Sequence, residues 1–459
     1  MAEVDSRLSD VPALLRDTAK RCQVPGAALA VLHGDALFEA ATGVVNVRAG
    51  VEATTDSVFE IGSITKVWTT TLVMQLVDEG RVELDAPVRR YLPELALADR
   101  AAAESITVRM LLTHTSGIDG DFFQSTGRGD DAVERYVLAC AALPQLHPPG
   151  ALWSYCNAGF VLAGRIVEKL RGCTWDEALR RHLLAPLGTE GMGTLPEHAL
   201  RFRAAIGHFM HPKSGHVVVA PLWPDPRSSG PAGATPFAFA RDLCRFARMH
   251  LDGGMAAGGA RVLSEASLRE MQKPQVRLPP TQRNADGWGL GWMLFDWCGQ
   301  RVIGHDGGTA GQFAFLRVVP EQRVAVALLT NGGDAGSLYR EIFAHVLGVL
   351  CGIALPPLPE ANPNVVVDLT RFVGRYERLA ARLDIALEDG RLVVRQHWSR
   401  PPFPVPDPPP LPLELIDERT LLVRLPPTGT PIAESFLEFD GAGRPQYVLA
   451  GARLHRRVA

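Results

Sequence analysis

The chain has 459 residues, which at about 150 residues per domain is enough for two or three domains with full hydrophobic cores. Its composition, 46% apolar and 21% charged, is that of an ordinary globular protein and excludes extensive disorder. Lys and Arg number 47 against 50 Asp and Glu, a net charge of −3. Because no basic excess is available to neutralise a phosphate backbone, we expect no nucleic-acid partner.

Cysteine usage and the N-terminal residues predict a reduced, cytoplasmic protein. The seven cysteines are scattered and include no C-x-x-C pair, which argues against a disulfide framework or a zinc ribbon. Residues 1–7 lack the basic and apolar regions of a signal peptide. The longest apolar run, residues 346–355, is about half as long as a bilayer crossing requires. We therefore expect no metal and no membrane association.

Strands and helices are both predicted over the first 355 residues. Residues 25–33 and 36–41 are predicted to form two strands around a Gly-Asp turn. Residues 67–79 carry apolar side chains at helical spacing and end before Gly80, a helix C-cap. The later predicted elements are helices at 158–170, 236–250 and about 337–353, and a hairpin of strands 313–319 and 324–330.

A serine and a lysine lie at the start of the helix predicted at 67–79. Ser63 and Lys66 are three residues apart and therefore share one helix face. A serine hydroxyl needs a nearby base to act as a nucleophile, and a lysine amine is such a base when burial or positive neighbours lower its pKa. The helix N-terminus adds free N–H groups for an oxyanion. This pair indicates nucleophilic catalysis, although a capping serine followed by a surface lysine has the same spacing.

Two later segments carry further polar residues. Tyr155 and Asn157 precede a predicted helix, where the tyrosine can relay the serine proton and the asparagine can hold a substrate amide carbonyl. Residues 304–308, Gly-His-Asp-Gly-Gly, precede a predicted strand, and a glycine-rich strand edge offers backbone N–H and C=O groups to an extended acyl chain. A buried tyrosine, an N-capping asparagine and a hairpin turn are the alternative readings. The probability that all three segments occur by chance in this order and at these separations is far lower than the probability of any one of them.

The sequence changes character after residue 355. Residues 356–364 contain four prolines and are predicted to form a linker. Alternating polar and apolar residues then predict strands at 383–387, 392–398, 421–425 and 435–439. Residues 401–412 are too rich in proline for a strand and are predicted to form a stiff loop. We expect a catalytic domain at 1–355, a linker at 356–364 and a small all-β domain at 365–459.

The chain resembles the serine β-lactamase and penicillin-binding-protein superfamily, in its class C and esterase-like branch, through Ser63-x-x-Lys66, Tyr155-x-Asn157 and His305-x-Gly307. This resemblance covers about residues 8–355 and implies an α/β sandwich that forms an acyl-serine intermediate. It implies Ser63 as the nucleophile, Lys66 and Tyr155 as general bases, and an oxyanion hole from the N–H groups of Ser63 and Gly308. Residues 365–459 resemble the lipocalin-like β-barrel that some members append.

The third motif departs from the pattern of the penicillin-recognising members. They usually carry Lys-Thr-Gly where this chain has His305-Asp306-Gly307. Loss of a fixed cation weakens the case for binding a β-lactam carboxylate and favours esterase, peptidase or acyl-transfer chemistry. The sequence leaves open whether His305 is charged or neutral near pH 7.

Within the superfamily, the chain is most similar to the penicillin-binding-protein-type thioesterases that cyclise nonribosomal peptides, as in surugamide biosynthesis. This resemblance implies a peptidyl thioester or ester substrate with a D-residue at its acylating end, a head-to-tail macrolactam product, and no cofactor. A peptidyl carrier protein is a candidate partner.

Other interpretations remain open at this stage. The activity could be that of an intracellular serine hydrolase, either a carboxylesterase or a D-aminopeptidase-like or β-lactamase-like enzyme, or the chain could be a catalytically inactive peptide-binding homologue. Near the C-terminus, Arg453 and Arg444 are candidates to pair with a substrate carboxylate or a carrier phosphopantetheine, with a solvated tail as the alternative. The sequence does not decide between cyclisation and hydrolysis, nor does it fix the oligomeric state.

Overall fold

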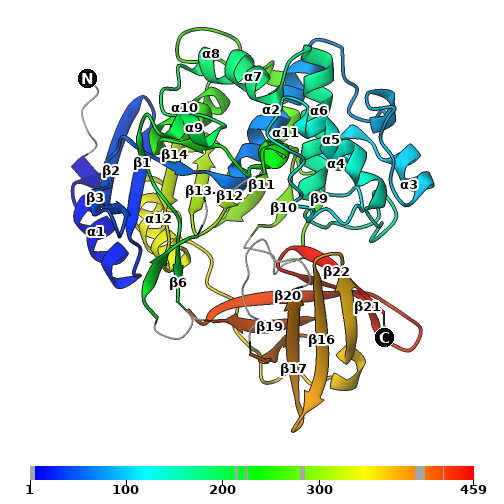
Figure 1. Ribbon diagram of the computed structural model, residues 1–459. Coiled ribbons are helices and arrows are strands. Elements are labelled where there is room, and N and C mark those ends of the chain that lie inside the picture. The colour runs from blue at the N-terminus through cyan, green and yellow to red at the C-terminus, as the bar shows by residue number, and fades with distance from the viewer. Residues whose placement is uncertain are drawn as a thin grey trace.

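The computed structural model describes residues 6–211, 215–221, 223, 226–279, 285–398, 409–426 and 428–458. These residues form an α/β unit and, below it in Figure 1, a β-barrel. Among them the α-helices are α1 (Val11–Arg21), α2 (Thr65–Asp78), α3 (Arg100–Ser105), α4 (Val108–Leu112), α5 (Ala132–Ala139), α6 (Asn157–Arg171), α7 (Trp175–Leu179), α8 (Ala185–Leu187), α9 (Pro196–Ala199), α10 (Ala240–Leu251), α11 (Glu265–Gln272) and α12 (Ala335–Cys351). The short 3-10 or π-helical segments are η1 (Ser6–Leu8), η2 (Gly62–Ile64), η3 (Val88–Arg90), η4 (Cys140–Ala142), η5 (Arg180–Leu184), η6 (Arg227–Ala232), η7 (Pro320–Gln322) and η8 (Leu369–Phe372).

The strands of the α/β unit are β1 (Gly26–His33), β2 (Ala36–Asn46), β3 (Val51–Glu52), β4 (Ser57–Glu60), β5 (Arg203–Ala204), β6 (His208–Met210), β7 (Val217–Val219), β8 (Phe237–Ala238), β9 (Val276–Arg277), β10 (Gly287–Trp288), β11 (Met293–Trp297), β12 (Gln300–Gly308), β13 (Phe313–Val319) and β14 (Val324–Thr330). The barrel strands are β15 (Gly374–Arg378), β16 (Ala381–Glu388), β17 (Arg391–Trp398), β18 (Leu411–Asp417), β19 (Thr420–Leu425), β20 (Thr430–Phe439), β21 (Pro445–Ala450) and β22 (Arg453–Arg457).

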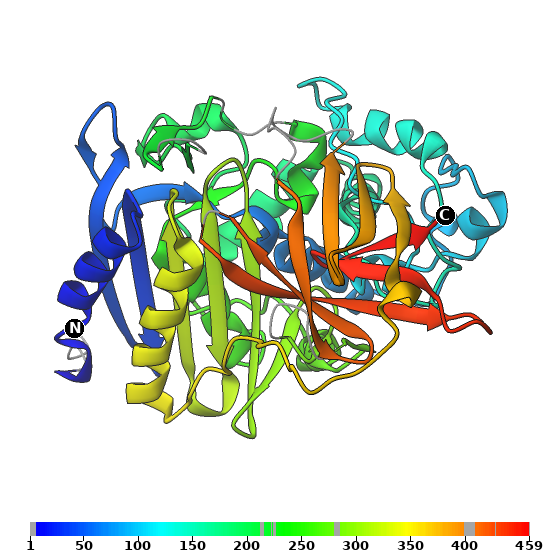
Figure 2. The same cartoon turned by 90° about the horizontal axis from the view of Figure 1, so that it is seen from below.

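A nine-stranded antiparallel sheet divides the described part of the α/β unit into two layers. Its strand order is β3-β2-β1-β14-β13-β12-β11-β10-β9. Strand β1 is apolar throughout because both of its faces are covered: Ala28 and Ala30 pack into the core with α2 and α6, whereas Ala27 and Leu29 pack into the core with α1 and α12. In Figure 2, α1 and α12 lie along one face of this sheet. The α/β sandwich predicted from the sequence is thereby confirmed.

The predicted elements of this unit differ from the structure mainly at their ends. Strand β2 continues to Asn46, five residues beyond the predicted end at residue 41. The helix predicted at 236–250 begins only at Ala240, because Phe237 and Ala238 pair with β4 as strand β8. The predicted hairpin is present as β13 and β14, with register Val319 opposite Val324.

The C-terminal residues form a closed antiparallel barrel of eight strands, β15 to β22. Alternate side chains, such as Leu383 and Ile385 on β16, face its hydrophobic core. The sequence predicted four of these strands and assigned residues 401–412 to a loop. That assignment is wrong at its end, because Pro412 lies in β18 opposite Val393; residues 401–408 lie outside the described residues.

The barrel packs directly against the α/β unit. Leu449 and Leu454 belong to the same buried cluster as Trp153 and Trp288. The contact also includes backbone pairing, because the N–H of Tyr155 donates to the carbonyl of Ala452 at 2.9 Å. The barrel therefore helps to hold the segment that carries Tyr155, a predicted catalytic residue. Among the described helices, none is long and apolar enough to cross a membrane.

Candidate active site

Ser63 lies in the short turn η2, directly before helix α2, where two glycines let strand β12 come close. Gly62 has φ +52°, and a Cβ there would lie 2.5 Å from the backbone N of Gly308. A Cβ on Gly307 would lie only 1.9 Å from the carbonyl O of Ile61. Larger residues would separate the serine turn from the end of β12. The close approach brings the backbone N of Gly308 beside the turn that carries Ser63, as a two-donor oxyanion hole requires.

Lys66 is fully buried on the first turn of α2, behind the serine. Its Nζ lies 2.9 Å from Oγ of Ser63 and donates to the carbonyl of Ala232 at 2.6 Å. Burial, reinforced by the positive charge of Arg453, lowers the pKa of Lys66 well below its ordinary value. A neutral amine beside a hydroxyl can accept its proton, so the pair has the geometry and the electrostatics of a base and its nucleophile.

Tyr155 approaches the same lysine from the loop before α6. The centre of its ring lies 4.9 Å from Nζ of Lys66, and the ring stacks on His114 with centroids 4.1 Å apart. Nδ1 of His114 accepts the N–H of Cys156 at 2.9 Å, which fixes the histidine ring and the backbone next to the tyrosine. Tyr155 is thus held by His114 on one side and by Ala452 of the barrel on the other.

His305 presents a hydrogen-bond acceptor to the site. Its Nδ1 lies 2.6 Å from the carbonyl of Asp306, so the ring proton is on Nδ1. Burial lowers the pKa of His305 to about 3, so the imidazole is neutral near pH 7. Its buried Nε2 has no hydrogen-bond partner among the described residues. The ring therefore cannot replace the cation of the Lys-Thr-Gly motif, and it is suited to accept an N–H or O–H from a substrate.

The buried carboxylate of Asp121 connects Asn157 with the barrel. Asp121 accepts from Nδ2 of Asn157 at 2.8 Å and from Nε of Arg453 at 3.0 Å, and it lies 3.1 Å from Nη1 of Arg378. Burial alone would raise the pKa of Asp121, but the guanidinium groups of Arg453 and Arg378 outweigh it and hold the pKa below its ordinary value. The carboxylate stays ionised and ties one asparagine to two barrel arginines.

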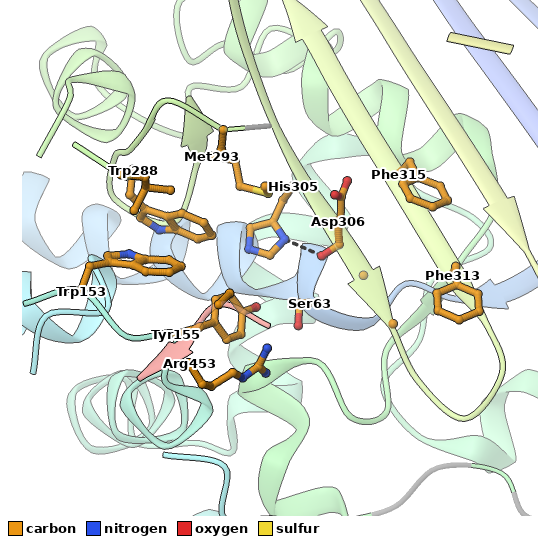
Figure 3. A pocket seen from close by; sticks show the side chains of 15 residues that line it. Ser63, Trp153, Tyr155, Trp288, Met293, His305, Asp306, Phe313, Phe315 and Arg453 are labelled. Carbon is orange, nitrogen blue, oxygen red and sulfur yellow. Dashed lines mark hydrogen bonds between the residues drawn. The ribbon is translucent and has the colours of Figure 1, made fainter. Parts of the chain in front are cut away.

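Ser63, Tyr155, His305 and Arg453 line a cavity of about 210 Å³. Figure 3 shows Tyr155 and Arg453 on one side of Ser63, with His305 and Asp306 on another. The walls are mainly apolar and aromatic and include Trp153, Leu278, Ala285, Trp288, Met293, Phe313 and Phe315. The cavity therefore presents a mainly apolar surface beside Ser63.

Most of the predicted site residues meet at this cavity. Its lining includes Ser63, Tyr155, His305, Gly307, Gly308 and Arg453, and Lys66 lies directly behind the serine. Asn157 is not part of the lining, and its Nδ2 is occupied by Asp121, so its observed contact is with the protein. Arg444 is not in the lining either; it pairs with Asp440 on the barrel surface.

Two residues of the site, Asp121 and His114, are not among the residues predicted from the sequence. Asp121 has no local signal, because its partner Arg453 is 332 residues away. Cys156 is fully buried, and burial raises the pKa of its thiol to about 11, so it is no competing nucleophile.

The pH dependence of acylation should report the charge on Lys66. Only the neutral amine accepts a proton, so the acylation rate should fall as pH drops through its pKa. Arg453 helps to lower that pKa, so Arg453→Gln should raise it and move the acid limb to higher pH. Stopped-flow acylation by a chromogenic ester measures the limb. Arg395→Gln, which removes an arginine paired with Glu388 on the barrel, should leave it in place, and an unmoved limb in Arg453→Gln would contradict this assignment.

A serine beside a buried lysine, with a tyrosine and a glycine-rich strand edge around one cavity, is the arrangement of a serine enzyme. Residues 11–347 match the Beta-lactamase family, and the chain belongs to that family. It is 49% identical over 359 residues to penicillin-binding protein 4 of Amycolatopsis lactamdurans, covering 77% of this chain and 93% of that protein.

Solved structures also resemble this chain, and some of them match nearly its whole length. The crystal structure of SurE matches with a TM-score of 0.80 and 28% identity over 99% of both chains, and the structure of SurE with D-Leu matches with a TM-score of 0.76 over 99% of this chain and 100% of that one. A D-stereospecific amidohydrolase from Streptomyces sp. matches with a TM-score of 0.57 and 28% identity, over 75% of this chain and 99% of that chain. The likeness to SurE therefore extends beyond the family match at 11–347.

Proposed function

We propose that this protein is a serine acyltransferase that converts a linear peptidyl thioester into a head-to-tail macrolactam. The observation that carries the proposal is that Ser63 and Arg453 line the same cavity. The proposed nucleophile and the barrel therefore both face a bound substrate. The likeness to SurE over nearly all of both chains supports it. The sequence resemblance to thioesterases that cyclise nonribosomal peptides supports the same substrate class.

Acylation begins with attack of Oγ of Ser63 on the thioester carbonyl carbon. Lys66 takes the hydroxyl proton, and the N–H groups of Ser63 and Gly308 stabilise the tetrahedral oxyanion. The C–S bond then breaks, the thiolate leaves as a thiol with that proton, and the peptide is held as an ester on Ser63. Because Lys66 starts and ends this step neutral, its lowered pKa is essential.

Cyclisation requires the peptide's own amine to reach that ester before water does. The amine attacks the ester carbonyl, Lys66 or Tyr155 accepts a proton from it, and the C–O bond breaks to return the hydroxyl to Ser63. The neutral His305, with its unpartnered Nε2, is suited to accept a hydrogen bond from the amine. Holding the amine beside the ester supplies a large effective molarity, and the barrel residues Ala452 and Arg453 form part of the cavity wall.

The stereochemistry of the acylating residue is part of the proposal. SurE has been crystallised with D-Leu, and the cavity wall of Leu278, Trp288 and Met293 suits a bulky apolar side chain. We therefore propose a D-residue at the C-terminal, acylating end of the peptide. Hydrolysis is the second candidate, favoured by the match to a D-stereospecific amidohydrolase; both reactions share the acyl-enzyme and differ only in the second nucleophile.

Two peptidyl thioesters that differ only in C-terminal chirality test this proposal. The D-form should give mainly the cyclic product, identified by the loss of the thiol without gain of water in its mass and by its retention time, and the L-form should give little. The Ser63→Ala variant is the matched control. Linear acid from both forms would overturn the cyclase assignment and make the protein a hydrolase.

A further inference from the structure

A second cavity, of about 380 Å³, opens into the end of the barrel next to the catalytic cavity. This volume lies in the range of roughly 300–1,000 Å³ that is typical of small-molecule sites. Arg453 lines both cavities, so they adjoin at that side chain. The middle of the barrel cavity has apolar walls, formed by Ala380, Ala381, Leu383, Val423, Leu425, Ile432 and Ala450. A ligand held at Ser63 can therefore extend past Arg453 into the barrel.

Glu434 on β20 lines this cavity and forms no ion pair with the described residues. It lies opposite Leu421 of the neighbouring strand, and both side chains are on the face of the barrel core. The residue is only 3% exposed, and its Oε2 accepts no hydrogen bond from the described residues. Burial raises the pKa of Glu434 to about 7, with no contribution from a charged neighbour. A buried carboxyl without a partner is costly for a folded protein, and such groups indicate a missing ligand or water.

The two arginines of the cavity are paired with a single carboxylate. Arg378 and Arg453 both pair with Asp121. His455 has its pKa lowered to about 3 by burial and is neutral. The cluster of Arg378, Arg453 and Asp121 lies in the part of the cavity that Arg453 shares with the active site, whereas Glu434 has no charged neighbour among the described residues. A ligand cation therefore has an unpaired acceptor in Oε2 of Glu434.

We propose that the barrel cavity binds an alkylammonium group, with its methylenes against the apolar walls and its ammonium hydrogen-bonded to Glu434. The source we assign is a lysine or ornithine side chain within the peptide substrate, and this part rests on the proposed function. Anchoring an internal side chain in the barrel would fold the peptide back, so that its amine end approaches the ester on Ser63.

Binding of pentan-1-amine to the resting enzyme, measured by titration calorimetry, tests the site without turnover. The wild type should bind it at least about tenfold more tightly than pentan-1-ol, because an ionic hydrogen bond is worth about that factor. Glu434→Gln should remove this preference, whereas Glu418→Gln, at an exposed glutamate of the same barrel, should retain it. Circular dichroism checks that both variants fold. Equal binding of amine and alcohol by the wild type, or an unchanged preference in Glu434→Gln, overturns the proposal.

Peptidyl thioesters that carry lysine or norleucine at one internal position, scanned along the peptide, test the source of the amine. At one position the wild type should show a KM at least about tenfold lower for lysine, and Glu434→Gln should show equal KM values. Consumption of thioester gives KM whether the product is cyclic or linear, so failure of cyclisation does not affect this measurement. Amine binding in the calorimeter without a lysine preference at any position would overturn the assignment to the peptide and leave a free alkylamine as the ligand.

Discussion

Replacing Ser63 with alanine is expected to lower kcat by roughly five to six orders of magnitude, because the covalent route disappears. The fold should be unaffected, since the structure gives Oγ of Ser63 one side-chain partner, Lys66. Turnover of a chromogenic acyl ester and intact-mass detection of the acyl adduct measure the two consequences. Ser105→Ala, at an exposed serine of α3, should keep both the turnover and the adduct. A persistent adduct on Ser63→Ala would show that another residue is the nucleophile.

The two residues beside the Ser63 hydroxyl, Lys66 and Tyr155, should also behave as one unit. Lys66→Ala and Tyr155→Phe should each cost several orders of magnitude, and the double variant should lose far less than the product of the two losses. Lys66 and Tyr155 are proposed to move protons in the same acylation step. Once one of them is lost, the other can therefore contribute little to the rate. A double-mutant cycle on the acylation rate measures this coupling; strictly multiplicative losses would mean that the two residues act in separate steps.

Local patterns in the sequence predicted the parts of the site that lie within one element. The spacing of Ser63 and Lys66 places both on one helix face, and the structure finds their reactive atoms 2.9 Å apart. Residues 304–308 were predicted to precede the strand at 313–319, and in the structure they form the end of the neighbouring strand β12. The same reasoning located β1 and β14, because both are nearly continuous apolar runs buried on both faces.

Contacts between distant segments could not be predicted in this way. Asp121 is held by Asn157 and Arg453, and neither spacing nor periodicity relates residues 332 positions apart. The neutral state of His305 depends on burial that only the folded chain creates. Glu434 shares the alternating face of Ile432 and Phe436, but only the closed barrel shows that this carboxyl is buried. Sequence reasoning fails where tertiary contact, and not local geometry, determines charge and position.

Asp121→Asn should therefore be the most destabilising conservative change at the junction of the two units. It removes the carboxylate that compensates Arg453 and Arg378, and breaking a buried ion pair from one side costs about 3–5 kcal/mol. Denaturant unfolding followed by circular dichroism measures this loss. Asp440→Asn, which removes an acid paired with Arg444 on the barrel surface, should change the stability little.

The pH dependence of the stability lost in Asp121→Asn shows whether the charge of Asp121 is responsible. The pKa of Asp121 is held below its ordinary value in the folded protein, so its stabilising effect is complete at neutral pH and disappears as pH falls through the folded pKa. The difference in unfolding free energy between the wild type and Asp121→Asn should accordingly be largest near pH 7 and shrink in acid, as the wild-type carboxyl becomes protonated. A difference that stays constant down to the lowest accessible pH would mean that the asparagine disturbs packing, and that the charge of Asp121 does not hold the barrel arginines in place.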